Sequence, residues 1–484
     1  MRHAPVLVVL APLLNALACP LIAYVSATAA RGVTRLALGI SLVCSSVALS
    51  HSLAEGPWHY HLAGWPPPWG IEIVIDSLSG VMAVLVSAMG FLGAIYSDAY
   101  LSTATDERAG IFYSVFSLLV TGLLGIVVTG DLFNLYVFLE ISSLSAYALL
   151  ATGGSRAVVA TFRYLLVGTV AASFYLIGVG YLYAMTGTLN MADMSGRLAV
   201  PPDSPVVLVG VSFIVIGLAI KAALFPLHGW LPDAYTFAPG PVIGFIAAVM
   251  AKVSAYALYR ILYFVFRAES VPGEPLMLLG WASALAVVAG SVMAVAQKDV
   301  QRMLAYSSIG QMGYIIMGVA MGTPLALIGA LLHVVNHAVM KGCLFMAVNG
   351  VQWQAGIFRI RDFTGVAKRF PITMTAFTTA ALSMIGLPPT AGFFSKYYLA
   401  LAAVETGHLP FLVALVLSSL LGAVYFFRVI ERAYLMDHDG PETPSTRDLP
   451  GSMLIPIVVL ALAVVLLGVF NQTVANELLE PGLP

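Results

Sequence analysis

The sequence predicts an all-α polytopic membrane protein, and three observations support this class. Charged residues make up only 9% of the 484 residues, whereas about a quarter is typical of soluble domains. Hydrophobic residues make up 60% of the chain, and the mean hydropathy is +0.95. The third observation is a succession of apolar runs of about 20 residues, the length that a helix needs to cross a bilayer. Together these properties exclude a soluble protein.

The apolar runs predict about 14 transmembrane helices. The first run follows Arg2 as the apolar core of a signal peptide would, but it is too long for one, so we interpret it as a retained helix. The runs lie near residues 4–26, 33–51, 74–97, 110–130, 132–152, 158–186, 205–227, 241–266, 276–296, 303–321, 324–350, 372–403, 408–432 and 452–471.

Lysine and arginine residues predict the orientation of the chain. Outside the predicted spans most of them fall in alternate loops, among them Arg31, Arg108 and Lys368. The other loops hold few, among them Arg2 and Arg197. Because cytoplasmic loops are enriched in lysine and arginine, we expect both termini on the non-cytoplasmic side.

The cysteines and the basic residues exclude several classes of function. Cys19, Cys44 and Cys343 are isolated in apolar surroundings, so they form no CxxC pair, iron–sulfur run or disulfide framework. We therefore expect neither a cofactor nor a metal in this chain. No basic stretch is typical of a nucleic-acid interface, so no nucleic-acid partner is expected.

Five charged residues lie inside the predicted spans: Glu140, Lys221, Lys252, Lys341 and Lys396. Each costs about 2.5–3.5 kcal/mol at the centre of a membrane helix, and such residues usually mark a transport path. They could instead reach an interface or form static ion pairs between helices. We favour a buried line of protonatable groups, because helix packing alone does not need them.

Two of the predicted spans are interrupted. Pro226 and Pro232 follow Lys221, and Pro388 and Pro389 precede Lys396. Proline breaks a helix, and broken helices inside a membrane are typical of transporters built from inverted repeats. The placement of the breaks predicts two inverted five-helix repeats, spans 4–8 and 9–13, each with one broken helix. The expected domains are three N-terminal helices (1–100), a first repeat (110–266), a second repeat (276–435) and a C-terminal helix with its tail (450–484).

Histidines extend the line of protonatable groups. His333, His337 and Lys341 follow at intervals of four, so they lie on one face of a helix. A metal site, a haem ligand or an accident of packing would each explain part of this pattern, but no further ligand can be assigned, and a proton relay explains it better. His228 is a weaker candidate, because the prolines spoil its helical spacing from Lys221. Two further histidines are expected to face solvent in a loop: His59 and His61.

A neighbouring glutamate could control whether a buried lysine holds or releases a proton. Burial disfavours the charged form of a lysine, and a carboxylate about 4 Å away favours it by a similar free energy. Making or breaking a contact between Glu140 and Lys221 would therefore load or release a proton.

Several segments resemble the antiporter-like membrane subunits of respiratory complex I, of membrane-bound hydrogenases and of Mrp-type multisubunit cation/proton antiporters. The resemblance covers roughly residues 75–435, and the wording of the first segment is most similar to the D-type component of the Mrp antiporters. The segments are GDLFNLYVFLEISSLSAYALLA, IKAALFPLHGWLPDAYTFAPGPV, AKVSAYALYR, AYSSIGQMGYIIMGV, LLHVVNHAVMKGCLFMAVNG and IGLPPTAGFFSKYYLA.

The resemblance implies a role for each buried charge. Glu140 and Lys221 match the family's glutamate–lysine pair, and Lys252 matches its bridging lysine. His333, His337 and Lys341 match its polar helix, and Lys396 matches the lysine at which the proton leaves or enters.

The resemblance also implies a function. The leading hypothesis is a proton-translocating subunit of a multisubunit Na⁺ (or other monovalent cation)/H⁺ antiporter in a bacterial plasma membrane, with sister subunits, protons and lipid as partners. The alternative is a proton-pumping subunit of an NADH:quinone oxidoreductase or a membrane-bound hydrogenase. A stand-alone carrier for an organic solute is a third, remoter possibility.

Overall fold

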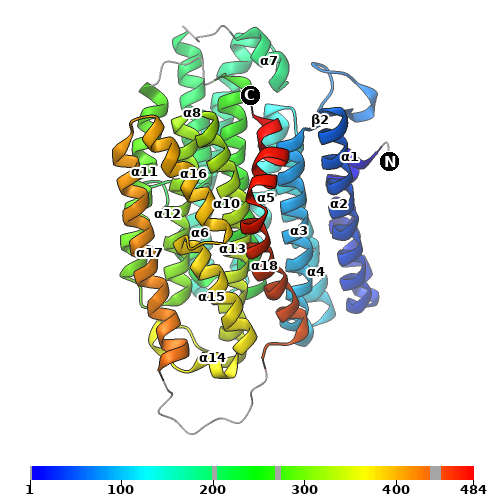
Figure 1. The fold of residues 1–484 in the computed structure, drawn as a ribbon. Helices are drawn as coiled ribbons and strands as arrows, with labels where there is room; N and C mark the ends of the chain where they lie inside the picture. The colour runs from blue at the N-terminus through cyan, green and yellow to red at the C-terminus, as the bar shows by residue number, and fades with distance from the viewer. Residues whose placement is uncertain (1–2, 199–203, 268–273, 437–447, 484) are drawn as a thin grey trace.

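The computed structural model describes residues 3–198, 204–267, 274–436 and 448–483. The chain folds into a bundle of helices that run along one common axis (Figure 1). In the described part of the chain, 12 helices are long and apolar enough to cross a membrane. The prediction of an all-helical, multi-pass membrane protein is confirmed.

The N-terminal part consists of three long helices and a β-hairpin. The hairpin pairs His59 with Val74 and His61 with Glu72 in antiparallel register. His59 and His61 are exposed to solvent as expected, but the expectation of a loop is wrong, because both lie in β1, where strand pairing brings them near the carboxylate of Glu72. The elements are α1 (Ala4–Val25), α2 (Ala27–Glu55), β1 (Trp58–His61), β2 (Glu72–Ile75) and α3 (Ser77–Tyr100).

The middle of the chain holds the first interrupted segment. The elements are α4 (Asp106–Val128), α5 (Leu132–Ala151), α6 (Ser155–Thr186), the short α7 (Met191–Arg197), α8 (Pro205–Lys221), α9 (Leu231–Phe237) and α10 (Gly240–Arg260). Helix α10 continues into the π-helix η3 (Ile261–Val265). Lys221 is the last residue of α8, and the irregular stretch that follows contains Pro226, so the predicted interruption is present.

The second interrupted segment lies in the C-terminal half. The elements are α11 (Glu274–Val295), α12 (Val300–Met321), α13 (Pro324–Ala355), α14 (Val366–Arg369), α15 (Pro371–Ile385), α16 (Ala391–Glu405), α17 (Leu409–Leu435), α18 (Gly451–Val469) and the short α19 (Asn471–Thr473). The break between α15 and α16 contains Pro388 and Pro389, as expected. The division into two inverted five-helix repeats stays a prediction.

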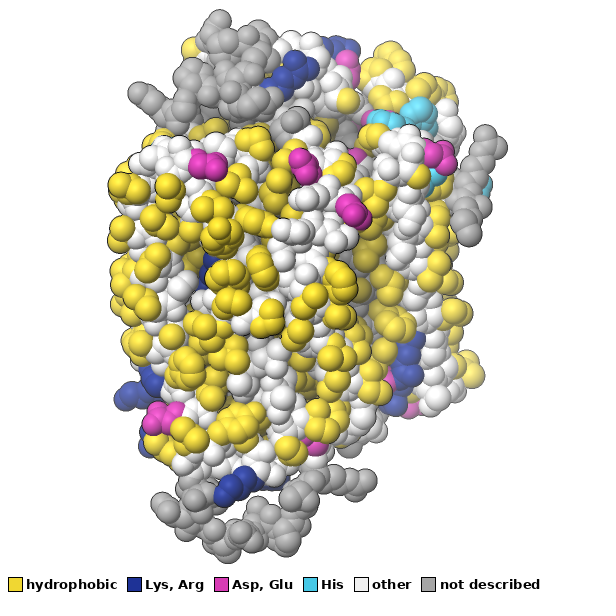
Figure 2. All heavy atoms as spheres, in the orientation of Figure 1, with side chains coloured by type: hydrophobic (Ala, Val, Ile, Leu, Met, Phe, Trp, Pro, Cys, Tyr) yellow, Lys and Arg dark blue, Asp and Glu magenta, His cyan; other side chains and the backbone are white. Residues whose placement is uncertain are grey.

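Helices α10 and α13 form the centre of the bundle. They pack against each other, and the most apolar stretch of each is entirely buried. Outer helices such as α2 and α17 instead expose large apolar side chains, including Leu36 and Leu420. Figure 2 shows hydrophobic side chains over the middle of one face, with most charged side chains near its two ends. This distribution suits a lipid environment.

The two ends of the described chain lie at the same end of the bundle, which also carries the β-hairpin (Figure 1). A chain that crosses a membrane an even number of times has both of its ends on the same side, so this placement agrees with an even number of spans. Which side of the membrane this end faces stays a prediction from the lysine and arginine distribution.

Candidate functional site

His333 on α13 is held by side chains from two neighbouring helices. Its Nδ1 lies 2.8 Å from Ser395 Oγ on α16, and its Nε2 lies 2.8 Å from Gln311 Oε1 on α12. The imidazole is completely buried. Because both ring nitrogens have partners, this histidine links α12, α13 and α16 through one hydrogen-bonded unit.

His337 follows one turn later with its ring almost parallel to that of His333, at a centroid distance of 5.7 Å. It is also completely buried. Neither of its ring nitrogens has a hydrogen-bond partner among the described residues. Unpaired polar atoms in a protein interior are rare and call for an explanation. Here they leave an imidazole that is free to accept or donate a proton.

Lys341 and Lys252 lie on the two central helices. Lys341 Nζ donates a hydrogen bond of 2.8 Å to Leu304 O on α12 and another to Ser307 Oγ on the same helix. Lys252 Nζ donates to Ala247 O at 2.5 Å within α10. Lys252 interacts electrostatically with Lys341 and with both α13 histidines. Helices α10 and α13 thus share one cluster of basic groups.

Lys396 lies at the second helix break. Its Nζ donates hydrogen bonds to Met384 O at 2.7 Å and to Ile385 O at 3.2 Å, the carbonyls at the end of α15. The last carbonyls of a helix have no partner within it, and a cation there also interacts favourably with the helix dipole. The ammonium lies 5.0 Å from the ring centre of Tyr314, which stacks on His333.

Lys221 lies at the first helix break but has a different set of partners. Its Nζ donates a 2.6 Å hydrogen bond to Ser143 Oγ on α5. Glu140, one turn earlier on α5, is only half-buried. No described carboxylate lies within the 4.0 Å ion-pair distance of the ammonium, so the expected contact between Glu140 and Lys221 is not made. The two charges still interact at longer range.

His228 lies apart from the other candidates. It belongs to the irregular stretch between α8 and α9, where it is half-buried and stacks on Phe225 at 4.9 Å. No described hydrogen bond or ring contact joins it to the α13 histidines. Its place in the proton path therefore stays a prediction.

Aromatic rings connect the Lys221 region with the central cluster. Tyr147 contacts Tyr164 at 4.7 Å, and Tyr164 stacks on Trp230 at 3.9 Å. The series continues through Tyr235 to Phe345, whose ring centre lies 5.8 Å from Lys341 Nζ. These ring contacts form one continuous packed layer between the Lys221 region and the central cluster.

Several partners of the basic groups were not recognised in the sequence. Gln311 and Ser307 belong to one polar segment of an otherwise apolar span, and their spacing of four was a usable signal. The others carry no such signal, because serine is common on membrane helices. The additional residues are Ser143, Ser307, Gln311, Ser395 and Ser419.

The fold and the buried groups define a class of protein: a polytopic helical membrane protein that holds ionisable side chains in its interior at two helix breaks. Residues 129–422 match the family described as NADH:quinone oxidoreductase/Mrp antiporter, TM. The chain belongs to this family and is an antiporter-type membrane subunit.

Individual relatives include both branches of the family. The chain is 54% identical to the N-type component of the NADH-quinone oxidoreductase of Desulforudis audaxviator, over 100% of this chain and 99% of the relative. It is 29% identical to the D-type component of the Na⁺/H⁺ antiporter of Bacillus subtilis, over 91% and 88%. A chain of the archaeal membrane-bound sulfane sulfur reductase superposes with a TM-score of 0.90 at 33% identity, over 100% of this chain and 97% of that chain.

Proposed function

We propose that this chain moves protons through the membrane along its buried basic groups, from the Lys221 region through the central cluster to Lys396. The observation that carries the proposal is the continuity of the second part of this line. Lys252, His337 and His333 interact with one another, and Lys396 interacts with both histidines.

The hydrogen-bond partners of the lysines suit proton release. Lys221, Lys341 and Lys396 donate to hydroxyl and carbonyl oxygens. A lysine that lost its proton would therefore leave no unpaired carboxylate behind in the interior, which would be costly.

Electrostatic repulsion between the buried basic groups would drive protons from one group to the next. A like charge nearby disfavours the charged form of an ionisable group. A proton that enters the cluster therefore weakens the hold of its neighbours on theirs. Entry at one end of the line promotes release at the other, provided that hydrogen-bonded donors and acceptors connect the groups.

The kind of complex is the second part of the proposal. The 54% identity to an N-type component of an NADH-quinone oxidoreductase, against 29% to a D-type component of a Na⁺/H⁺ antiporter, supports a redox-driven respiratory complex as the parent assembly. The Na⁺/H⁺ antiporter expected from the motifs remains the second candidate, supported by the match to the antiporter component over 91% of this chain. In both assemblies the chain would work beside sister subunits.

The experiment measures proton movement in membrane vesicles that contain the whole complex. Lys221→Ala, Glu140→Ala and Lys341→Ala are compared with wild type, using a pH-sensitive dye. The matched control is Lys298→Ala, which removes an exposed lysine between α11 and α12. We expect the variants at Lys221, Glu140 and Lys341 to lose most of the proton movement and the control to keep it. Full activity in these three variants would contradict the proposal.

The parent complex is identified separately. A tagged chain is purified with its partners, and the partners are identified by mass spectrometry. Iron–sulfur or flavin subunits would support the respiratory complex, and small hydrophobic antiporter subunits would support the cation antiporter. A functional assay makes the same distinction: proton movement driven by an electron donor would support the respiratory complex, and proton movement driven by a Na⁺ gradient would support the antiporter.

A further inference from the structure

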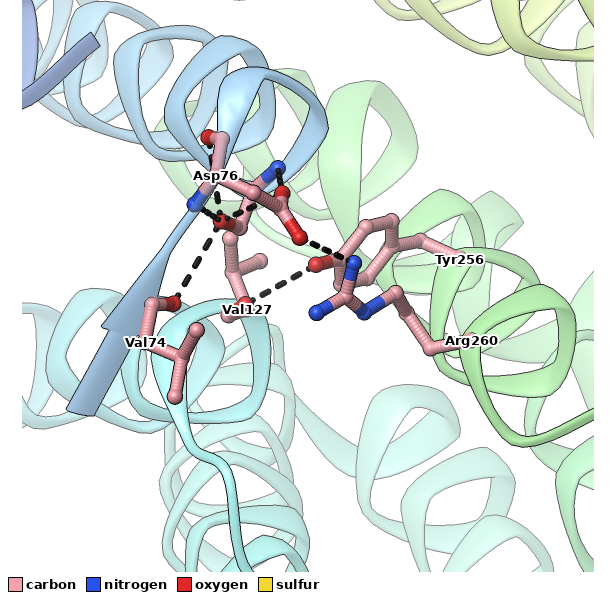
Figure 3. Close-up of polar contacts among 6 residues, drawn as sticks. Val74, Asp76, Val127, Tyr256 and Arg260 are labelled. Carbon is pink, nitrogen blue, oxygen red and sulfur yellow. Dashed lines mark hydrogen bonds and ion pairs between the residues drawn. The ribbon is translucent and has the colours of Figure 1, made fainter. Parts of the chain in front are cut away.

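A second charged cluster lies outside the line of basic groups. Arg260 at the end of α10 forms an ion pair with Asp76 at the start of α3 (Figure 3). Their side chains are only 14% and 15% exposed. A largely buried ion pair is weak evidence for stability in itself, because its desolvation cost can exceed the Coulombic gain. Its presence between two packed helices therefore suggests another purpose.

Asp76 is held rigidly from its own side of the pair. Its carboxylate accepts hydrogen bonds from Ser79 N at 2.8 Å and from Ser79 Oγ at 2.9 Å. The bond from Ser79 N and a second bond, from Asp76 N to Ser79 Oγ at 2.8 Å, form a capping box for α3. Burial alone would raise the pKa of the Asp76 carboxyl, but Arg260 and the Ser79 hydrogen bonds hold it below its ordinary value. The carboxylate is therefore ionised at neutral pH.

Arg260 is held equally firmly. Its guanidinium lies 4.1 Å from the ring centre of Phe264. The ring of Tyr256 lies beside the guanidinium, and its hydroxyl donates a 3.0 Å hydrogen bond to Val127 O at the end of α4 (Figure 3). The ionisable groups around the pair are Tyr256 and Tyr259 from α10 itself. The pair joins α3 to α10, and the neighbouring hydrogen bond of Tyr256 joins α10 to α4.

This point is connected with the proton line through α10. Lys252, Tyr256 and Arg260 follow at intervals of four and share one side of the helix. Lys252 lies eight residues before Arg260, about 12 Å along the helix axis. The intervening part of α10 is buried, so water does not screen a charge at Arg260 from Lys252.

We propose that the Asp76–Arg260 pair is a positioning element for Lys252. The pair fixes the end of α10 against α3. Its two charges also cancel, so that no net charge at this end of α10 disturbs the protonation of Lys252. This inference rests on the proposed function, in which Lys252 carries protons.

The test is the pH profile of proton movement in vesicles that contain the complex. Asp76→Asn leaves an unbalanced cation, which repels a proton on Lys252, so we expect the pH of half-maximal rate to fall. Arg260→Gln leaves an unbalanced anion and should raise it. At an effective dielectric constant of 20, a charge at about 12 Å shifts the profile by about 1 pH unit. Shifts in the same direction, or none, would overturn the inference.

Two further variants keep the test decisive where a single variant fails to assemble. The double variant Asp76→Asn/Arg260→Gln should keep the wild-type midpoint but have a lower maximal rate, because the ion pair between α3 and α10 is gone while the charge is balanced. Arg260→Lys keeps the charge and should restore most of the rate. A double variant with the wild-type rate would overturn the inference. Recovery of the intact complex on a native gel is measured for every variant.

Lys252→Ala separates this inference from the proposed function. If that variant moves protons normally, the proposed line is wrong. If it moves none while the Asp76 and Arg260 variants behave as wild type, only the positioning role is wrong.

Discussion

Lys221 Nζ donates a 2.6 Å hydrogen bond to Ser143 Oγ, and this serine lies one turn beyond Glu140 on α5. The lysine therefore contacts a neutral hydroxyl while the carboxylate remains nearby. Ser143 Oγ donates its own proton to Leu139 O at 2.6 Å and accepts from the lysine. A neutral amine keeps two N–H groups, so it can still donate to Ser143 after the proton has left. This arrangement differs from a static ion pair, which would hold the proton on the lysine.

Removing this hydroxyl should slow proton movement. Ser143→Ala deletes a hydrogen bond to a charged group, and such bonds contribute about 1.5–3 kcal/mol, so we expect a loss of about tenfold or more in the vesicle assay. The control is Ser142→Ala on the same helix, whose hydroxyl bonds to Leu139 O. Equal rates in both variants would argue against a role for Ser143.

The amide of Gln311 should be needed to orient His333. Gln311→Leu removes the partner of His333 Nε2 at similar volume, so the imidazole loses its fixed orientation between α12 and α16. We expect a lower rate of proton movement with the complex still assembled. Gln297→Leu, at the end of α11 where the amide bonds to Met293 O, is the control and should behave as wild type.

Lys396 should contribute to stability as well as to transport. Lys396→Met keeps most of the volume but leaves the carbonyls of Met384 and Ile385 without their cation. Leaving buried acceptors unpaired costs about 1–3 kcal/mol, so we expect a lower Tm of the purified complex together with loss of proton movement. An unchanged Tm would mean that other groups satisfy these carbonyls.

A methyl group at Gly168 should disturb the surroundings of Lys221. A Cβ there would overlap Tyr147 Oη and lie 3.5 Å from Lys221 Nζ, so Tyr147 would have to move. We expect Gly168→Ala to reduce proton movement. Gly180→Ala on the same helix meets no atom within 4 Å and is the matched control. Similar losses in both variants would indicate a general effect on α6.

The line of basic residues was visible in the sequence because charge is rare in apolar spans. The two interruptions were visible because proline acts locally on the helix that contains it. The β-hairpin was missed, since its strands are four residues long and lie in a stretch rich in proline, glycine and histidine. The absent contact between Glu140 and Lys221 could not be foreseen, because it depends on side-chain geometry between α5 and α8.

The sequence by itself determined the membrane class, the helical architecture and the identity of the buried basic residues, because hydropathy, helix breaking and the cost of burying charge are local properties of the chain. Only the tertiary structure decided which groups these residues contact. His333 and Ser395 are 62 positions apart, and Asp76 and Arg260 are 184 positions apart. Such contacts follow from how helices pack against each other, and no local pattern of residues encodes that packing.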